Sequence, residues 1–151
     1  MRNLIDCLKK RVNVRLKTTT WSGEEMLEHD INTEGVLSMG VDEAEIEFTE
    51  VSSDNEKLSF FIQVKDGKAV ISRESINMSN TIVLDPYHVN IAAFNTEFGS
   101  MEMKIITESL DIDFRSASGH IEASYLFAFS KQNEYQRCNL RLEYSEINIF
   151  K

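Results

Sequence analysis

The segment GHIEASYLFAFS, Gly119 to Ser130, decides the fold class. Its residues alternate between two faces, with Ile121, Ala123, Tyr125, Phe127 and Phe129 on one face and Glu122, Ser124, Leu126 and Ala128 on the other. Successive side chains of a β-strand point to opposite faces, so this alternation is typical of a half-buried strand. The aromatic face either lines a ligand cavity or fills a core, and the segment alone leaves both interpretations open.

The same period of two continues from Val12 to the C-terminus. Apolar and polar residues alternate over residues 12–17, 44–49 and 58–64. Strands with one wet face are typical of antiparallel sheets. Asp66-Gly67 then predicts a type I′ hairpin, because both central residues of that turn adopt positive φ.

These patterns predict one all-β domain over residues 1–151. Long antiparallel strands must hide their edges, and closure into a barrel removes those edges, with a β-sandwich as the alternative. We expect residues 1–11 to form a short helical extension, because Leu4, Ile5 and Leu8 recur at helical spacing. A change of parity between Tyr144 and Ile147 predicts a β-bulge near Ser145-Glu146.

Composition excludes several classes of partner. The net charge of −9 and the pI near 4.8 disfavour nucleic acid, because the field around the protein repels phosphate. No apolar run has the length of a membrane span. The N-terminus lacks the features of a secretory signal, so we expect Cys7 and Cys138 to be free thiols in a reducing cytoplasm.

A family resemblance covers roughly Val12 to Ile149. It rests on a Thr-x-x-Gly turn between two strands, a Thr that closes the second strand, an acidic strand, and a Gly followed by Ile that opens a strand with a Tyr. An Arg at the end of the strand after the Asp-Gly hairpin and a final strand with an apolar-Tyr pattern extend the likeness. The residues in these positions are Thr96 and Gly99, Thr107, Asp111 and Asp113, Gly119, Ile121 and Tyr125, Arg73, and Leu142 with Tyr144. In these features the chain resembles the YwiB-like family of small bacterial proteins of unknown function. The resemblance implies a calycin-like (lipocalin-like) β-barrel of about eight or more strands and supplies no reaction.

The sequence carries no catalytic, metal or cofactor motif. His29, His88 and His120 are far apart and have no second His or Cys at metal-ligand spacing. His88 with Asp85 is the nearest approach to an oriented base, yet no nucleophile turn and no glycine-rich phosphate loop accompanies it. Asp111 and Asp113 share a strand face opposite apolar neighbours, which predicts ordinary solvated carboxylates. We therefore expect a non-enzymatic protein without a cofactor.

The barrel interior is the remaining candidate site. A barrel of about eight strands is just wide enough to be filled by side chains or to hold one small ligand. Arg73, Met101, Met103, Tyr125 and Phe127 are the candidate ligand-binding residues, with the Tyr hydroxyl and the Arg as polar handles for a small, largely apolar molecule. The alternative is an interaction module with a packed core, whose outer face forms a homodimer or docks a partner protein.

Overall fold

The computed structural model describes residues 8–129 and 134–147. These residues form ten strands: β1 (Leu8–Ser22), β2 (Glu25–Met39), β3 (Glu43–Val51), β4 (Lys57–Lys65), β5 (Lys68–Ser75), β6 (Met78–Leu84), β7 (Asn90–Thr96), β8 (Gly99–Phe114), β9 (Ser118–Phe129) and β10 (Gln136–Glu146). This part of the chain contains no helix long and apolar enough to cross a membrane.

The predicted N-terminal helix is wrong over residues 8–11, and residues 1–7 lie outside the described part of the chain. Leu8 to Arg11 are the first residues of β1 and pair with Val36 to Met39 of β2. The ladder of a long hairpin satisfies these backbone groups, and this tertiary pairing outweighs a short stretch of helical spacing.

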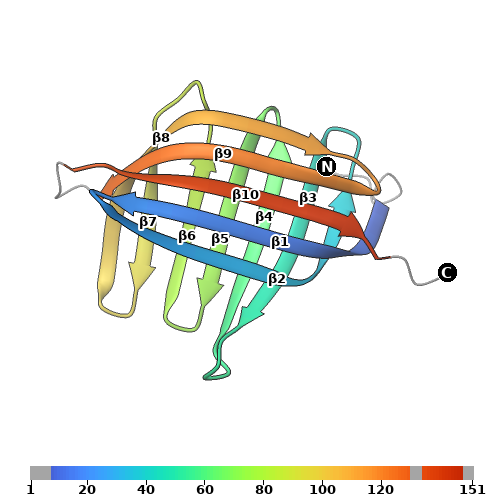
Figure 1. Cartoon of the computed structure of the whole chain (residues 1–151), viewed down its shortest axis with the longest axis horizontal. Helices are drawn as coiled ribbons and strands as arrows, with labels where there is room; N and C mark the ends of the chain where they lie inside the picture. The colour runs from blue at the N-terminus through green and yellow to red at the C-terminus, as the bar shows by residue number, and fades with distance from the viewer. Residues whose placement is uncertain (1–7, 130–133, 148–151) are drawn as a thin grey trace.

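All neighbouring strands are antiparallel, and the sheet closes on itself in the order β1-β10-β9-β8-β7-β6-β5-β4-β3-β2. Figure 1 shows the long strands β8, β9, β10, β1 and β2 in front, running across the shorter strands β3 to β7 behind them. The prediction of an all-β antiparallel barrel is confirmed. The barrel is flattened into two crossed layers, so its interior is the space between them.

Local turn chemistry accounts for the β4–β5 hairpin. Asp66 and Gly67 have φ angles of 54° and 74°, and Lys65 pairs with Lys68 across them. The positive φ at both central positions confirms the type I′ geometry expected of Asp-Gly.

The predicted bulge near Ser145-Glu146 is wrong. Ser145 pairs with Ser118 and Glu146 pairs with Val12 without a register shift, and β10 ends at Glu146. The change of parity therefore marks the end of the strand. In the described residues, the register shift between adjacent strands lies instead in β8, between Thr107 and Ser109.

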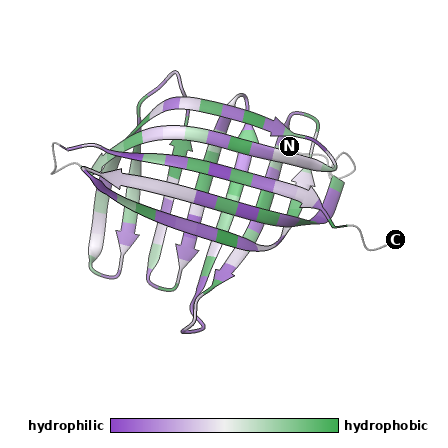
Figure 2. Ribbon diagram, viewed as in Figure 1, coloured by the Kyte–Doolittle hydropathy of each residue, from purple (hydrophilic) through white to green (hydrophobic). Residues whose placement is uncertain are grey.

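The core is the set of inward-facing side chains of both layers. Figure 2 shows hydrophobic and hydrophilic residues interspersed along the long strands, as expected for walls with one wet face. Fully buried side chains come from both layers: Val12, Val14, Leu37, Ile46, Ile62, Leu84, Ile105, Ile121 and Leu142. They belong to one continuous hydrophobic cluster that ties the layers together.

The barrel wall is incomplete at two places. β2 pairs with β3 only through Gly35–Met39, so the half of β2 from Glu25 to Glu34 has no partner strand on that side. β6 and β7 pair only through Met78–Asn80 and Phe94–Thr96. These breaks lie where the ladder is shortest, and His29 on the unpaired half of β2 lines a cavity inside the barrel.

Candidate functional site: a cavity inside the barrel

A cavity of about 220 Å³ lies inside the barrel. Its wall is mostly apolar and takes side chains from both layers: Leu16, Phe60, Ile71, Ile82, Phe94, Met103, Tyr125, Phe127, Phe129 and Leu140. The polar lining consists of Thr18, Thr20, His29, Arg73, Asn80 and Cys138. An apolar cavity with a few polar groups is the usual form of a small-molecule site.

The aromatic face of the opening segment lines this cavity. Tyr125 is 9% exposed, and Phe127 packs against the hydrophobic cluster, with the two ring centroids 6.2 Å apart. Phe129 on the same face lies edge-on to Phe94 of β7, at a centroid distance of 6.4 Å. The face expected to point inward on the sequence pattern therefore does so, and it borders a hollow as well as the core.

Arg73 reaches the cavity from β5. Its Nε donates a hydrogen bond to Oδ1 of Asn80, its cross-strand neighbour on β6, at 3.1 Å. Asn80 is 5% exposed. The amide therefore fixes the direction of the guanidinium with a neutral oxygen, which orients the positive charge without neutralising it.

Tyr125 supplies a buried hydroxyl. Burial raises the pKa of this phenol well above its ordinary value, and its contact with the Cys138 thiol adds to the shift, whereas the nearby Arg73 charge opposes it. The phenol is therefore protonated at neutral pH and can donate a hydrogen bond. Cys138 is a buried free thiol, as expected, while Cys7 lies outside the described residues.

The cavity reaches the surface at His29. This residue lies on the unpaired half of β2, and its side chain is 55% exposed. His29 Nε2 lies 3.1 Å from Oε1 of Glu50 on β3, so the pair spans the break between the two strands. Thr18 and Thr20 share the cavity wall with His29.

Four of the five predicted ligand-binding residues line the cavity: Arg73, Met103, Tyr125 and Phe127. Met101 does not, and its side chain is 49% exposed. Parity fixes the face of a strand on which a residue lies, but it does not fix the depth of that residue along the barrel. Met101 lies close to the Thr96–Gly99 turn, and its cross-strand partner is Phe94 of β7.

Asn80 was missed by the sequence analysis, although a signal was present. It shares its parity with Ile82 and Leu84 on β6, and both are buried. A polar residue in the inward register of an otherwise apolar face is the signal that would have found it.

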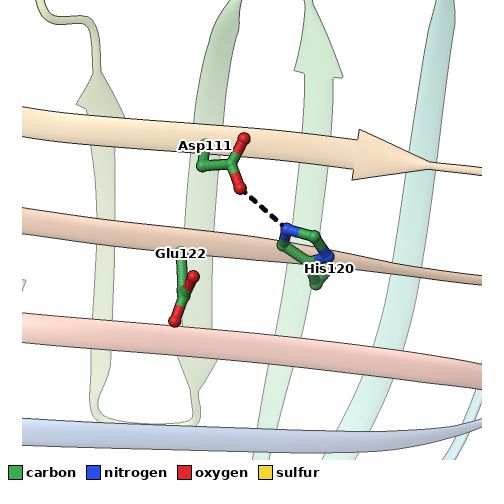
Figure 3. A group of neighbouring side chains, drawn as sticks. All are labelled: Asp111, His120 and Glu122. Atoms are coloured by element: carbon green, nitrogen blue, oxygen red, sulfur yellow. Dashed lines mark hydrogen bonds and ion pairs between the residues drawn. The ribbon is translucent and has the colours of Figure 1, made fainter.

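A group of metal-ligating side chains gathers on the outer wall. Asp111 on β8 and His120 and Glu122 on β9 bring one ligand atom each within 4.8 Å of one another. Figure 3 shows the three side chains side by side. His120 Nε2 lies 2.9 Å from Oδ2 of Asp111. Because these side chains come from two neighbouring strands, their spacing along the sequence does not predict that they lie together.

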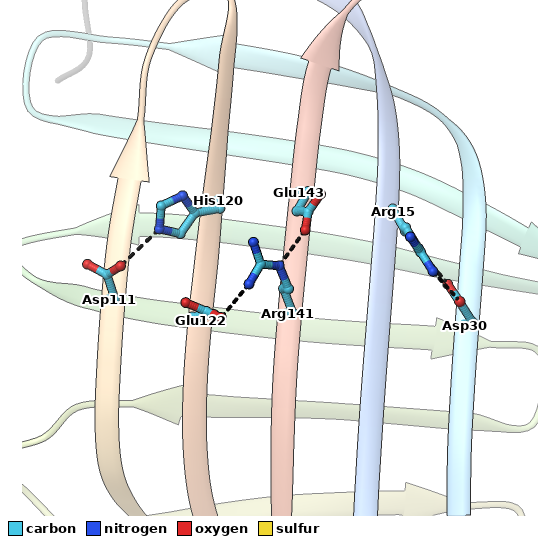
Figure 4. Close-up of polar contacts among 7 residues, drawn as sticks. All are labelled: Arg15, Asp30, Asp111, His120, Glu122, Arg141 and Glu143. Carbon is cyan, nitrogen blue, oxygen red and sulfur yellow. Dashed lines mark hydrogen bonds and ion pairs between the residues drawn. The ribbon is translucent and has the colours of Figure 1, made fainter.

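This group belongs to a row of ion pairs across the outer wall (Figure 4). Arg141 of β10 donates from Nη1 to Oε1 of Glu122 at 2.5 Å and also pairs with Glu143. Further along the row, Arg15 pairs with Asp30 at 2.9 Å. A metal ion at this group would compete with the Arg141 contact, so the arrangement present is that of a paired surface.

Asp85 and His88 form a second polar cluster, in the turn after β6. Oδ2 of Asp85 lies 2.8 Å from Nδ1 of His88, and its Oδ1 accepts the backbone N–H of Tyr87 at 3.0 Å. The Tyr87 hydrogen bond is the main reason why the pKa of Asp85 is lowered. The Asp85 backbone N–H donates to Oγ1 of Thr107 on β8. These bonds cap the turn and join it to β8, which is a structural role.

Comparisons with known proteins agree with the barrel. No match was found among the curated proteins. The crystal structure of the ywiB protein from Bacillus subtilis superposes with a TM-score of 0.81 at 15% sequence identity, covering 96% of this chain and 98% of that chain. At this identity the likeness shows a shared fold. The family described as "Domain of unknown function (DUF1934)" matches residues 13–142, which is most of the chain, and the protein therefore belongs to the DUF1934 family.

Proposed function

We propose that this protein is a non-enzymatic binder of a small, largely apolar molecule held inside the barrel. The observation that carries the proposal is the cavity of about 220 Å³, whose mostly apolar wall is shared with the hydrophobic core. Protein interiors have few voids larger than a water molecule. An apolar wall that faces water is unfavourable, and a guest that covers this wall removes that cost.

The volume limits the size of the guest. An apolar cavity of about 150 Å³ accepts benzene. Scaling that volume to the cavity in this barrel gives a guest of about nine non-hydrogen atoms. The opening beside His29 allows a longer molecule to extend into solvent.

A bacterial cytoplasm is part of the same proposal. Cys138 is a free thiol in the cavity wall, and a reducing compartment would preserve it. Oxidation there would add polar oxygen atoms to the surface that the guest contacts.

One observation favours a second candidate, a homodimer. The half of β2 from Glu25 to Glu34 has no partner strand along the edge that faces β3, and Met26 and Leu27 at its start are largely exposed. Unpaired strand edges can be extended by another chain. Light scattering after size exclusion tests this candidate, with Asn32→Pro as the variant that would block a new ladder.

The binding experiment uses two guests of suitable size, 1-octanol and octanoate. Each is titrated into protein with ¹³C-labelled methionine and leucine methyl groups. We expect shifts at Met103 and Leu140 and a rise in Tm, because both residues line the cavity.

Leu140→Phe should fill part of the cavity and weaken binding. Leu126→Phe is the matched control, because Leu126 lies on the face of β9 that points away from the cavity. If neither guest moves the cavity methyl groups of the wild type, the proposed function is wrong. Unchanged binding by Leu140→Phe would equally contradict it.

A further inference from the structure

We infer that the guest is a small amphipathic carboxylate whose head group pairs with Arg73 while its hydrocarbon part fills the apolar cavity. This inference rests on the proposed function and goes further by naming the chemical class of the ligand. It is built on the position of one positive charge inside an apolar chamber.

Arg73 differs from the other arginines of the described chain in its partners. Each of the others forms an ion pair on the outer wall: Arg11 with Glu34, Arg15 with Asp30, Arg115 with Asp113, Arg137 with Glu108, and Arg141 with Glu122 and Glu143. Arg73 has a hydrogen bond to the neutral amide of Asn80, and no described carboxylate lies within ion-pair distance of it. The arginine that faces the cavity is therefore the one without a counter-charge among the described residues.

A charge in an apolar setting is costly unless an opposite charge accompanies it. Arg73 is half-buried, with Phe60 and Asn80 as its cross-strand neighbours. The bond to Asn80 uses Nε, so both terminal Nη groups remain available in the described part of the chain. The planar fork of a guanidinium matches the two oxygens of a carboxylate.

The cavity offers a second donor for the same head group. Tyr125 approaches from β9, in the layer opposite β5, and lines the same cavity as Arg73. A protonated phenol can donate its O–H hydrogen bond to a carboxylate oxygen, which is a strong acceptor. The single positive charge of the guanidinium balances a monoanion and the neutral hydroxyl adds a hydrogen bond, whereas a phosphate dianion would need further cations.

The rest of the lining suits a hydrocarbon chain or ring. Phe94, Phe127 and Phe129 surround the part of the cavity contributed by β7 and β9. By the same proportion to a benzene-sized cavity, the cavity volume matches about nine non-hydrogen atoms, so a carboxylate of about seven or eight carbon atoms fits with its end at the opening beside His29. Octanoate is therefore a suitable probe, and 1-octanol and octylamine are its neutral and cationic counterparts.

The experiment compares these three compounds by isothermal titration calorimetry on the full chain. For the wild type we expect octanoate to bind about 10- to 100-fold more tightly than 1-octanol, the gain typical of a charge-assisted hydrogen bond. Octylamine should bind most weakly, because its ammonium would meet the Arg73 charge.

Variants of Arg73 test the assignment of the head group. Arg73→Gln should reduce octanoate affinity to that of 1-octanol and leave the affinity for 1-octanol within about twofold, since it removes only the charge-assisted pair. Arg73→Lys should give an intermediate affinity, because it keeps the charge and loses the fork. Arg141→Gln, on the outer wall, is the matched control and should bind octanoate as the wild type does.

The two proposals fail in different ways. If none of the three compounds binds, the proposed function fails and the inference fails with it. If 1-octanol binds as tightly as octanoate, or if Arg73→Gln retains full octanoate affinity, the cavity binds guests but the carboxylate assignment is wrong. The comparison of the three compounds on the wild type still tests the carboxylate assignment if Arg73→Gln does not fold.

Discussion

The ring of Tyr144 occupies the space that a side chain at Gly119 would need. Tyr144 on β10 pairs directly with Gly119 on β9, and a Cβ built on Gly119 would lie 2.5 Å from Cε2 and Oη of Tyr144. The Tyr144 hydroxyl donates to the backbone oxygen of Arg115 at 2.5 Å. One tyrosine thus covers the glycine at the start of β9 and ties the β8–β9 turn to β10.

Gly119→Ala should destabilise the protein by about 1–3 kcal/mol, the usual cost of overpacking a tight site. The added methyl would also meet the backbone oxygen of Asp113 at 2.6 Å, which cannot move aside easily. Urea denaturation measures the change. Gly40→Ala is the control, because its Cβ would make ordinary contacts at 3.6 Å. Equal stability of the two variants would contradict the packing described for Tyr144.

Tyr144 should make stability depend on alkaline pH. Burial raises the pKa of this phenol to about 12, from an ordinary value near 10. The folded state therefore holds the proton more tightly, so the stabilisation is complete below pH 10 and is lost as the pH rises toward 12.

We expect the wild type to lose about 2 kcal/mol more than Tyr144→Phe between pH 9 and pH 11.5, on the linkage of about 1.4 kcal/mol per pKa unit. Chemical denaturation at several pH values measures both curves. Tyr125 titrates in the same direction in both proteins, so its effect cancels in the difference. Parallel curves would show that the Tyr144 proton does not contribute.

Phe127→Ala should cost about 2 kcal/mol, below the 3–5 kcal/mol typical of a fully buried phenylalanine. The reason is that Phe127 already borders a hollow and is only partly buried. The variant should also accept larger guests, which can be measured with decanoate against octanoate. Leu126→Ala on the opposite face is the control, and a loss above about 4 kcal/mol would mean that the cavity around Phe127 is filled in solution.

Zinc should not stabilise the wild type through Asp111, His120 and Glu122. The ion would have to displace Arg141 from Glu122, whose Oε1 lies 2.5 Å from Nη1 of Arg141. We expect a change in Tm of less than about 1 °C at a moderate excess of Zn²⁺, and a larger rise in Arg141→Gln, which frees the carboxylate. A large rise in the wild type that His120→Ala abolishes would instead reveal a metal site.

The sequence by itself determined the fold class and the face of each long strand. Alternation of side chains is a local property of extended backbone, so the inward direction of Tyr125 and Phe127 follows from the residues around them. The Asp66-Gly67 turn is equally local, since positive φ at two successive residues depends on those residues alone. Local spacing was misleading at Leu8 to Arg11, where pairing with β2 decides the conformation.

Only the tertiary structure decided how far each side chain lies from the barrel's end and which distant strands meet. Met101 and Met103 share a face of β8, yet Met103 is 7% exposed and Met101 is 49% exposed. The placement of Arg73 from β5 and Tyr125 from β9 on one cavity wall depends on closure of the sheet and on the register of β8. Register and closure arise from the sum of many weak contacts between segments remote in the chain, and no single segment of the sequence encodes that sum.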